Sequence, residues 1–242
     1  MRRVVRPGDT VFDIGANVGQ FTFLLGHVVG REGSVHAFEP VPVTFEALRA
    51  AARRNPVPAR LVLNDCALSD VASTVSLFVP GGDLTQASMT RHRTSSWSAG
   101  GATVRTCQGI TADSLDDYVS RRGVGDVSFV KCDVEGAELL VLRGARSLLS
   151  RPAPPILLLE VYEEWTRDFG YAPRDLFEFL AKTAGYGFYH LDRAGLNWFG
   201  NWHDAVPGRF PEHLNFLCVV PDVHGDRLAR ALKDCGAALK AC

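Results

Sequence analysis

A glycine-containing turn that begins with an acidic residue follows the first strand-like run of this sequence. The run is Thr10–Ile14, and the turn is Asp13-Ile14-Gly15-Ala16-Asn17-Val18-Gly19. Ligands of open α/β sheets bind beyond the carboxyl ends of the strands, where glycine lets a ligand approach the backbone. The turn lacks the G-x-G-x-x-G pattern of NAD-binding proteins, because its glycines are Gly15 and Gly19 alone. Asp13 places a carboxylate beside the turn, which suits an ammonium group or a hydroxyl better than a pyrophosphate.

Two further acidic residues stand after later strand-like runs and predict a nucleoside pocket. Glu39 ends the run at 34–39, where a carboxylate can accept two hydrogen bonds from a ribose diol. Asp65 follows the run at 60–64 and can accept a hydrogen bond from an adenine amino group; the alternative is a solvated loop. Together with the turn at 13–19, these residues predict a pocket for adenosine with an acidic residue at each side.

A second acidic turn, Lys131-Cys132-Asp133-Val134-Glu135-Gly136-Ala137-Glu138, follows the run at 127–131. Acidic residues at a helix N-terminus are ordinary partners of the helix dipole, and Glu138 can be explained in that way. Asp133 and Glu135 come earlier, at the strand end beside the glycine turn. There they can contact a ligand bound at that turn, orient a substrate hydroxyl, hold a divalent cation or act as a general base.

Strand-like runs alternate with helical stretches, which predicts parallel βαβ units. The predicted strands are 10–14, 34–39, 60–64, 127–131, 156–160, 188–191 and 216–220, and the predicted helices are 18–29, 42–54, 114–122, 137–149, 174–183 and 226–240. A hairpin-like excursion joins the last two strands, so we expect a mostly parallel sheet with one antiparallel strand near its edge. The prediction is an α/β, Rossmann-like fold with a seven-stranded sheet, in a single domain over residues 1–242.

Two segments outside this alternation are expected to serve the ligand site. Residues 80–102 are polar, lie between short strands at 75–79 and 103–106, and are interpreted as a lid-like loop over the sheet. The segment at 193–213 contains Asn197-Trp198-Phe199-Gly200-Asn201-Trp202-His203, whose rings and amides suit stacking against a sugar or planar acceptor. The alternative is that these aromatic residues pack on the edge of the sheet.

Composition argues against some functions. The 242 residues carry a formal net charge of −1, which creates no field to attract a polyanion, so nucleic acid is not the expected partner. The stretch Arg91-His92-Arg93 with Trp97 has the residue types of a single-strand binding surface, but a solvated loop or a contact with an anionic acceptor explains it more simply. No apolar stretch is long enough for a signal peptide or a membrane span, so a cytoplasmic protein is expected.

The sequence resembles the FkbM family of S-adenosylmethionine-dependent methyltransferases. The resemblance rests on four segments in the expected order, which are Val11–Gly19, Phe38-Glu39-Pro40, Ala67-Leu68-Ser69-Asp70 and Lys131–Glu138. It implies a class I methyltransferase fold with S-adenosylmethionine over the carboxyl ends of the first strands. Carried over by position, Asp13, Gly15, Asn17 and Gly19 would contact the methionine part, Glu39 the ribose, and Asp65 with Cys66 the adenine, while Asp133 stands beside the cofactor turn.

Family members most often methylate hydroxyl groups of natural products, sugars or glycolipids, so the resemblance implies an O-methyltransferase with a small-molecule or sugar acceptor. An alcohol is a weak nucleophile near neutral pH, and a base or a metal must relieve its proton as the new bond forms. The candidate bases are Asp133, Glu135, Glu160, Glu163, His190 and His203. Asp133 and Glu160 could also hold Mg²⁺, since adjacent strand ends bring carboxylates together.

Two other functions stay open, namely a protein of this fold that binds the cofactor without turnover and a methyltransferase that acts on nucleic acid. Many family members carry a longer stretch before the first strand than the nine residues that precede Thr10 here. A cover for the acceptor is therefore expected from the loop at 80–102 or from a partner subunit, and the latter would require a homo-oligomer.

Overall fold

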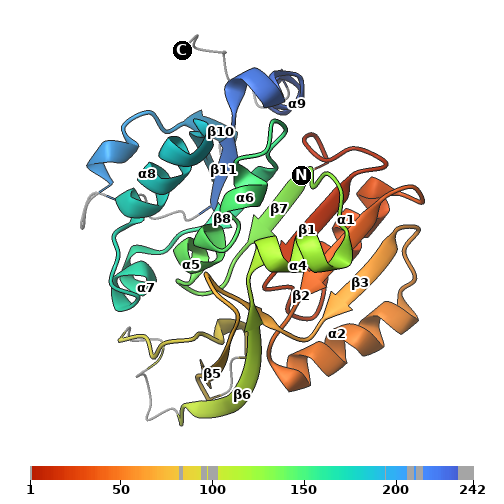
Figure 1. Ribbon diagram of the computed structural model, residues 1–242, viewed down its shortest axis with the longest axis vertical. Coiled ribbons are helices and arrows are strands. Elements are labelled where there is room, and N and C mark those ends of the chain that lie inside the picture. The colour runs from red at the N-terminus through yellow and green to blue at the C-terminus, as the bar shows by residue number, and fades with distance from the viewer. Residues whose placement is uncertain are drawn as a thin grey trace.

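A mixed sheet of eight strands runs through the centre of the computed structural model (Figure 1), which describes residues 2–81, 84–93, 97, 103–193, 195–205, 210 and 215–233. The strand order is β10-β9-β11-β8-β7-β1-β2-β3. The bounds are β1 Thr10–Ile14, β2 Ser34–Phe38, β3 Arg60–Asn64, β7 Phe129–Cys132, β8 Ile156–Glu160, β9 Gly187–Asp192, β10 Gly195–Trp198 and β11 Asn215–Val219. From β3 to β8 neighbouring strands are parallel, β11 is antiparallel to β8 and β9, and β10 is antiparallel to β9. The predicted α/β fold with a mostly parallel sheet is confirmed.

The sheet has one strand more than predicted. The seven predicted strands are all present, and the eighth is β10, which forms a hairpin with β9 in which Gly195 lies opposite Asp192. Two strands, β10 and β11, therefore run against the others, where one was predicted. The reason is that β10 is an edge strand in which only Leu196 is buried, so it shows no continuous apolar run. In the sequence it is part of the aromatic segment at 193–213.

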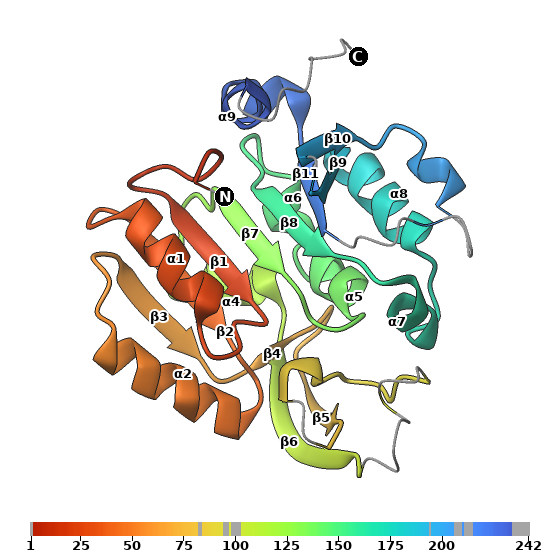
Figure 2. The ribbon, with the colours of Figure 1, turned by 180° about the vertical axis from the view of Figure 1, so that it is seen from behind.

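Helices cover both faces of the sheet (Figures 1 and 2). One face carries α4 (Leu115–Arg122), α5 (Glu138–Arg143), α6 (Arg146–Leu149) and α8 (Pro173–Ala184), and the other carries α1 (Gln20–Val29), α2 (Pro42–Arg54) and α9 (Pro221–Lys233). Side chains alternate along each strand, so Phe12 and Ile14 pack with the first set of helices while Val11 packs with α1 and α9. Because both faces of the strands are buried, the carboxyl ends of the central strands have fixed positions.

Several predicted helices have different bounds in the structure. The stretch predicted at 137–149 forms two helices, divided near Gly144, where a Cβ would lie 2.1 Å from the carbonyl oxygen of Ser69. The last helix begins at Pro221, and the end predicted for it at 240 lies outside the described residues. The short helix α7 (Glu163–Asp168) was not predicted, because six residues are too few to show a helical period of apolar residues.

A second sheet lies at the end of the large sheet toward which β1, β7 and β8 point (Figure 2). Its strands, in the order β4-β6-β5, are β4 (Ala67–Leu68), β6 (Arg105–Asp113) and β5 (Ser73–Val79). The short strands predicted at 75–79 and 103–106 thus pair with each other, although β6 extends further than predicted. The loop between them contains η1 (Leu84–Gln86), and a bridge between Phe78 and Ser88 folds it back along β5.

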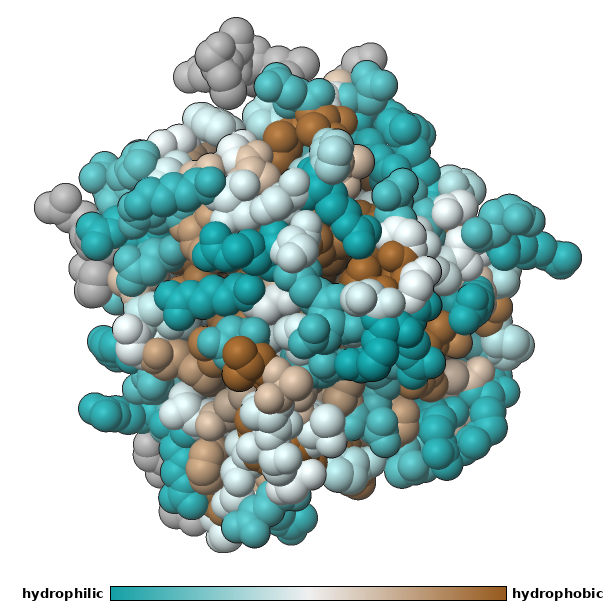
Figure 3. All heavy atoms as spheres, viewed as in Figure 1, coloured by the Kyte–Doolittle hydropathy of each residue, from teal (hydrophilic) through white to brown (hydrophobic). Residues whose placement is uncertain are grey.

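Hydrophobic side chains lie in small groups among hydrophilic ones on the face seen in Figure 3. Within the described ranges, no helix is both long and apolar enough to cross a membrane. The large apolar side chains are instead concentrated between the sheet and its two layers of helices.

Candidate active site

The carboxyl ends of β1, β2, β7 and β8 open into a cleft of about 380 Å³. The turns after these strands, the residues after β3, and Leu77 of β5 with part of the 84–93 segment form its walls. Of the site residues predicted from the sequence, the cleft is lined by Gly15, Asn17, Glu39, Cys66, Asp133, Glu135 and Glu160. This edge of an open α/β sheet is where ligands bind.

Gly15 brings the turn after β1 into backbone contact with the turn after β7. Its φ is +74°, and a Cβ at this position would lie 1.9 Å from the carbonyl oxygen of Asp133, so both the backbone conformation and the space require glycine. Gly19 has a different role. It does not line the cleft, and a Cβ there would lie 2.6 Å from the side chains of Leu48 and Phe23, so it allows α1 to begin close to α2.

Glu39 joins the ends of the first two strands. Its Oε2 accepts a hydrogen bond from the backbone N–H of Asn17 at 2.9 Å, and its Oε1 accepts one from that of Val41 at 2.9 Å. Asn17 is held in the left-handed region with a φ of 50°. Burial raises the pKa of Glu39 to about 7, although both hydrogen bonds oppose the rise. Each carboxylate oxygen keeps a second lone pair, so Glu39 can still accept hydrogen bonds from a diol in the cleft.

Asp13 lies beneath the cleft and is not part of its lining. The side chain is fully buried; Oδ2 accepts a hydrogen bond of 2.6 Å from Thr22 Oγ1, and Oδ1 lies 3.9 Å from Lys131 Nζ. Burial raises the pKa of Asp13, and Lys131 opposes the rise. Asp13 therefore anchors α1 to the end of β1. It does not contact the cleft directly, but it forms an ion pair with Lys131, which lines the cleft.

Lys131 is a charged residue of the cleft that was not singled out in the sequence. It belongs to β7, is 5% exposed and lines the cleft. Its ammonium group lies 3.0 Å from Asp133 Oδ2 and donates a hydrogen bond of 3.1 Å to the carbonyl oxygen of Gly15. Burial alone would lower the pKa of Lys131, but Asp133 and Asp13 outweigh it and raise that pKa. The sequence did contain a signal for this residue, namely a lysine within a run of residues predicted to form a buried strand.

Asp133 and Glu160 place two carboxyl groups at the ends of neighbouring strands. Glu160 is the last residue of β8, and β8 pairs in parallel with β7, which ends directly before Asp133. Burial, together with the charge of Asp133 and a hydrogen bond to it, raises the pKa of Glu160 to about 8. A carboxyl group with a pKa in this range is suited to act as a general base near neutral pH.

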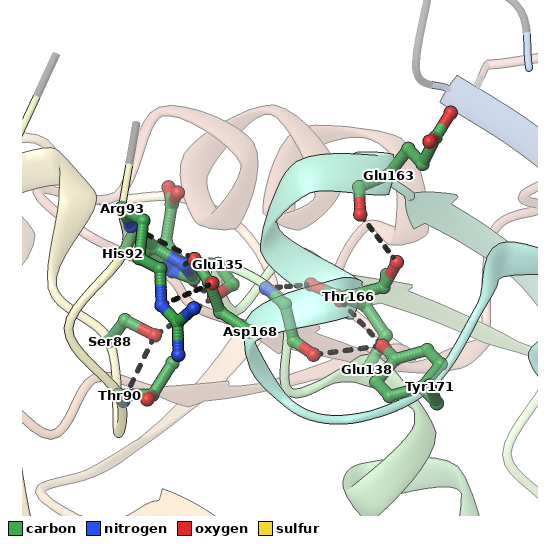
Figure 4. Close-up of polar contacts among 11 residues, drawn as sticks. Ser88, Thr90, His92, Arg93, Glu135, Glu138, Glu163, Thr166, Asp168 and Tyr171 are labelled. Carbon is green, nitrogen blue, oxygen red and sulfur yellow. Dashed lines mark hydrogen bonds and ion pairs between the residues drawn. The ribbon is translucent and has the colours of Figure 1, made fainter. Parts of the chain in front are cut away.

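Glu138 holds the turn that carries Glu135 (Figure 4). Its Oε1 accepts hydrogen bonds from the backbone N–H groups of Val134 at 2.9 Å and Gly136 at 3.3 Å, and the Tyr171 hydroxyl donates to the carbonyl oxygen of Gly136 at 2.8 Å. Burial raises the pKa of Glu138 to about 7. Glu138 is therefore a buried cap of its own turn. This turn keeps Glu135 in the left-handed region with a φ of 56°.

The 84–93 segment is fastened to the same turn through His92 (Figure 4). His92 Nε2 lies 2.8 Å from the carbonyl oxygen of Glu135, and Nδ1 lies 3.1 Å from Asp168 Oδ2 of α7. The imidazole stacks on Trp165 with ring centroids 5.3 Å apart, and Ser88 Oγ donates a second hydrogen bond to the Glu135 carbonyl oxygen. The segment is thus tied to both the acidic turn and α7, and its residues Thr85, Ala87 and Met89 line the cleft.

The residues that suggested a nucleic-acid surface do not form one patch. His92 is 5% exposed and Trp97 is 3% exposed, with their rings packed edge to face at 5.0 Å. Arg91 and Arg93 are exposed, and the backbone N–H of Arg93 donates to Asp168. Of these four residues, only the two arginines are therefore accessible to a ligand from solvent.

Several predicted site residues lie away from the cleft. Asp65 is exposed after β3 and is not among the lining residues. His203 is exposed in η3 (Trp202–Asp204), where its ring stands 3.6 Å from that of Trp202. His190 lies on β9, Glu163 begins α7, and neither lines the cleft. The described part of the 193–213 segment likewise contributes nothing to the lining.

The carboxyl groups of the cleft do not form a ready metal site. In the part of the chain that the structure describes, no three or more His, Cys, Asp or Glu side chains are grouped to hold a metal ion. Asp133 and Glu160 supply only a pair, and the ammonium group of Lys131 already contacts Asp133. Mg²⁺ binds protein through carboxylate oxygens and keeps its own shell of ligands, which a neighbouring ammonium would repel.

Comparison with known proteins agrees with this geometry. Residues 13–188 match the model of the methyltransferase FkbM domain. The 31-O-demethyl-FK506 methyltransferase FkbM of Streptomyces tacrolimicus is 35% identical over 162 residues, which cover 58% of this chain and 60% of that protein. The hexuronic acid methyltransferase AglP of Haloferax volcanii is 27% identical over 178 residues, which cover 72% of this chain and 62% of that protein. The aligned part thus spans about three fifths of the length of these relatives.

Proposed function

This chain belongs to the FkbM family of methyltransferase domains, and we propose that it transfers a methyl group from S-adenosylmethionine to a hydroxyl oxygen of a small molecule or sugar. The observation that carries the proposal is the arrangement of carboxyl groups in one cleft. Glu39 stands at the end of β2, and Asp133 and Glu160 stand at the ends of β7 and β8, with the Gly15 turn between them. The names of the two relatives, a 31-O-demethyl compound and a hexuronic acid, support a hydroxylated acceptor.

The residues of the cleft fit the cofactor. S-adenosylmethionine supplies a methyl group on a sulfonium ion, with a ribose diol and an amino acid at either end. Glu39 would hold the diol, since both of its oxygens can accept further hydrogen bonds. The turn with Gly15 and Asn17 would contact the amino-acid part, because both residues line the cleft and the glycine lets a ligand approach the backbone. Cys66 and Leu68 would contact the adenine.

The acceptor would be held between Glu160 and the 84–93 segment. Methyl transfer is an in-line displacement, so positioning of the acceptor oxygen supplies much of the rate. Glu160, in its ionised form, would take the hydroxyl proton as the new bond forms, and Asp133 beside it would orient the same hydroxyl. Thr85, Ala87 and Met89 would cover the acceptor, so the segment acts as a lid within a single domain.

Other assignments have less support. Magnesium-dependent transfer would use Asp133 and Glu160 as ligands, but the ammonium group of Lys131 already contacts Asp133. Binding of a nucleic-acid acceptor would need His92 and Trp97 at the surface, and both are buried. A role of residues 193–213 in acceptor binding is not supported by the cleft, because none of the described residues of this segment lines it. A cytoplasmic location and a homo-oligomer are also proposed, and cell fractionation and sedimentation of the purified chain would test them.

Calorimetric titration with S-adenosylmethionine and S-adenosylhomocysteine, with NAD as the control ligand, tests the proposal. We expect the first two to bind and NAD not to bind. A screen of hydroxylated metabolites would then follow, with release of S-adenosylhomocysteine as the readout. Folded protein that binds neither cofactor form would contradict the proposal, whereas binding without turnover across the screen would favour a binding protein of this fold.

A further inference from the structure

The ammonium group of Lys131 occupies a cage of oxygen atoms at the floor of the cleft. Its Nζ is 3.0 Å from Asp133 Oδ2, 3.1 Å from the Gly15 carbonyl oxygen and 3.9 Å from Asp13 Oδ1. The ring of Phe21 lies beneath it, with the centroid 5.1 Å away. An ammonium group has three N–H donors and no acceptor, and the Asp133 and Gly15 oxygen atoms lie within hydrogen-bond distance of it, whereas Asp13 Oδ1 forms only an ion pair with it.

The strand pairing builds this cage. Lys131 of β7 is in register with Asp13 of β1, so both side chains leave the sheet on the same side. The contact between the Gly15 turn and Asp133 brings in the other two oxygen atoms. A buried charge is tolerated only where it is paired and hydrogen-bonded, and here two carboxylates and a carbonyl group provide the pairing.

The same oxygen atoms are the ligand types that hard divalent cations prefer, namely carboxylate and backbone carbonyl oxygens. Glu160 also interacts with Asp133, so a second carboxyl group lies beside these oxygen atoms. A divalent cation in this place would have to displace an ammonium that is held inside the chain. The two cations compete for the oxygen atoms and repel each other.

We propose that Lys131 is a built-in substitute for a divalent cation: its ammonium group neutralises and orients Asp133, so this cleft works without a metal. Lys131 is thus a positioning residue that acts through Asp133 and Gly15. The inference deepens the function proposed above and rests on it only for the use of the cleft in methyl transfer. Removal of the ammonium group should convert the cage into a metal-binding site.

Titration of the 242-residue chain with Mn²⁺, followed by electron paramagnetic resonance of the free ion, tests this inference. Lys131→Met keeps most of the side-chain length without the charge, and we expect it to bind Mn²⁺ at least about tenfold more tightly than the original chain, because one repelling unit charge is gone. Lys131→Arg keeps a cation and should bind no better than the original chain. The double variant Lys131→Met with Asp133→Asn should lose the gain.

Two outcomes would overturn the inference. One is a folded Lys131→Met variant that gains no Mn²⁺ affinity. The other is Mn²⁺ binding in the cleft of the unaltered chain, which would be shown by loss of that binding in Asp133→Asn. This second measurement tests the inference even if Lys131→Met does not fold. Titration with S-adenosylhomocysteine is a separate measurement. Failure of cofactor binding would contradict the proposed function, whereas the Mn²⁺ results alone test the role of Lys131.

Discussion

His92 Nε2 lies 2.8 Å from the carbonyl oxygen of Glu135, and this contact joins the segment that covers the cleft to the turn that carries its acidic residues. A carbonyl oxygen only accepts, so Nε2 carries the donated hydrogen. Because Nδ1 faces Asp168, the same ring also joins the segment to α7. His92 and Ser88 are therefore the two side chains that fasten the cover of the cleft to the acidic turn.

Replacement of His92 by alanine should loosen this cover. We expect amide hydrogen exchange in residues 84–93 to accelerate and the free energy of unfolding to fall by roughly 2–4 kcal/mol, since a buried stacked ring, its hydrogen bond to the Glu135 carbonyl oxygen and its contact with Asp168 are lost. His203→Ala is the matched control, because that ring is exposed in η3 and outside the cleft. Exchange rates in 84–93 that do not change in His92→Ala would show that the segment is held by other contacts.

Gly15→Ala should disrupt the site more than an alanine at another glycine of positive φ. Gly185 has a φ of +69° and a ψ of 34°, in the left-handed region, with open space around its Cβ position, so Gly185→Ala should cost only the left-handed backbone strain of about 1–2 kcal/mol. At Gly15 the same strain is joined by a clash with the Asp133 carbonyl oxygen. We expect a larger loss of stability and loss of S-adenosylhomocysteine binding, measured by denaturant unfolding and calorimetry. Equal losses in the two variants would argue against close contact of the two turns.

The central sheet and the glycine turn were predictable because both depend on local sequence. Strands buried on both faces show as apolar runs, and Pro42 at the first position of α2 marks a helix start. Strand β10 was missed because burial of Leu196 alone leaves no pattern. The long helix at 137–149 was predicted undivided because the approach of Gly144 to Ser69 is a tertiary contact.

The site was predictable only where a residue's place at a strand end decides its surroundings. Glu39, Asp133 and Glu160 line the cleft for that reason. The positions of Asp65 and His203 relative to the cleft depend on the paths of loops, and the periodicity of apolar residues in the sequence does not reveal those paths. Lys131 was missed because a lysine is usually a surface residue, and only the register with Asp13 shows that its charge is paired inside the sheet.

Glu39 should make cofactor binding depend on pH. Burial raises the pKa of Glu39 to about 7, so below that pH the group gains a proton and becomes a poorer acceptor for the ribose diol. We expect the affinity for S-adenosylhomocysteine to fall as the pH drops through about 7. Glu39→Gln should bind about 1–3 kcal/mol more weakly at high pH and lose this pH dependence.

Asp65→Asn is the control for Glu39, because Asp65 is exposed and outside the lining of the cleft. Unchanged affinity in this variant is expected from the structure. A loss as large as that of Glu39→Gln would instead support the adenine contact predicted from the sequence. A pH-independent affinity in the unaltered chain would remove Glu39 from the cofactor site.

Glu160 should set the pH dependence of methyl transfer. Burial and the neighbouring Asp133 raise its pKa to about 8, and a general base acts only after it has lost its proton. With an acceptor from the metabolite screen, we expect the single-turnover rate to rise with pH and to level off above about 8. Glu160→Gln should lower that rate by roughly 10²–10⁴-fold while leaving the affinity for S-adenosylhomocysteine nearly unchanged. A rate that is flat between about pH 6 and 9, or an equal loss of rate and cofactor affinity in Glu160→Gln, would assign the proton transfer to another group and leave Glu160 as part of the scaffold.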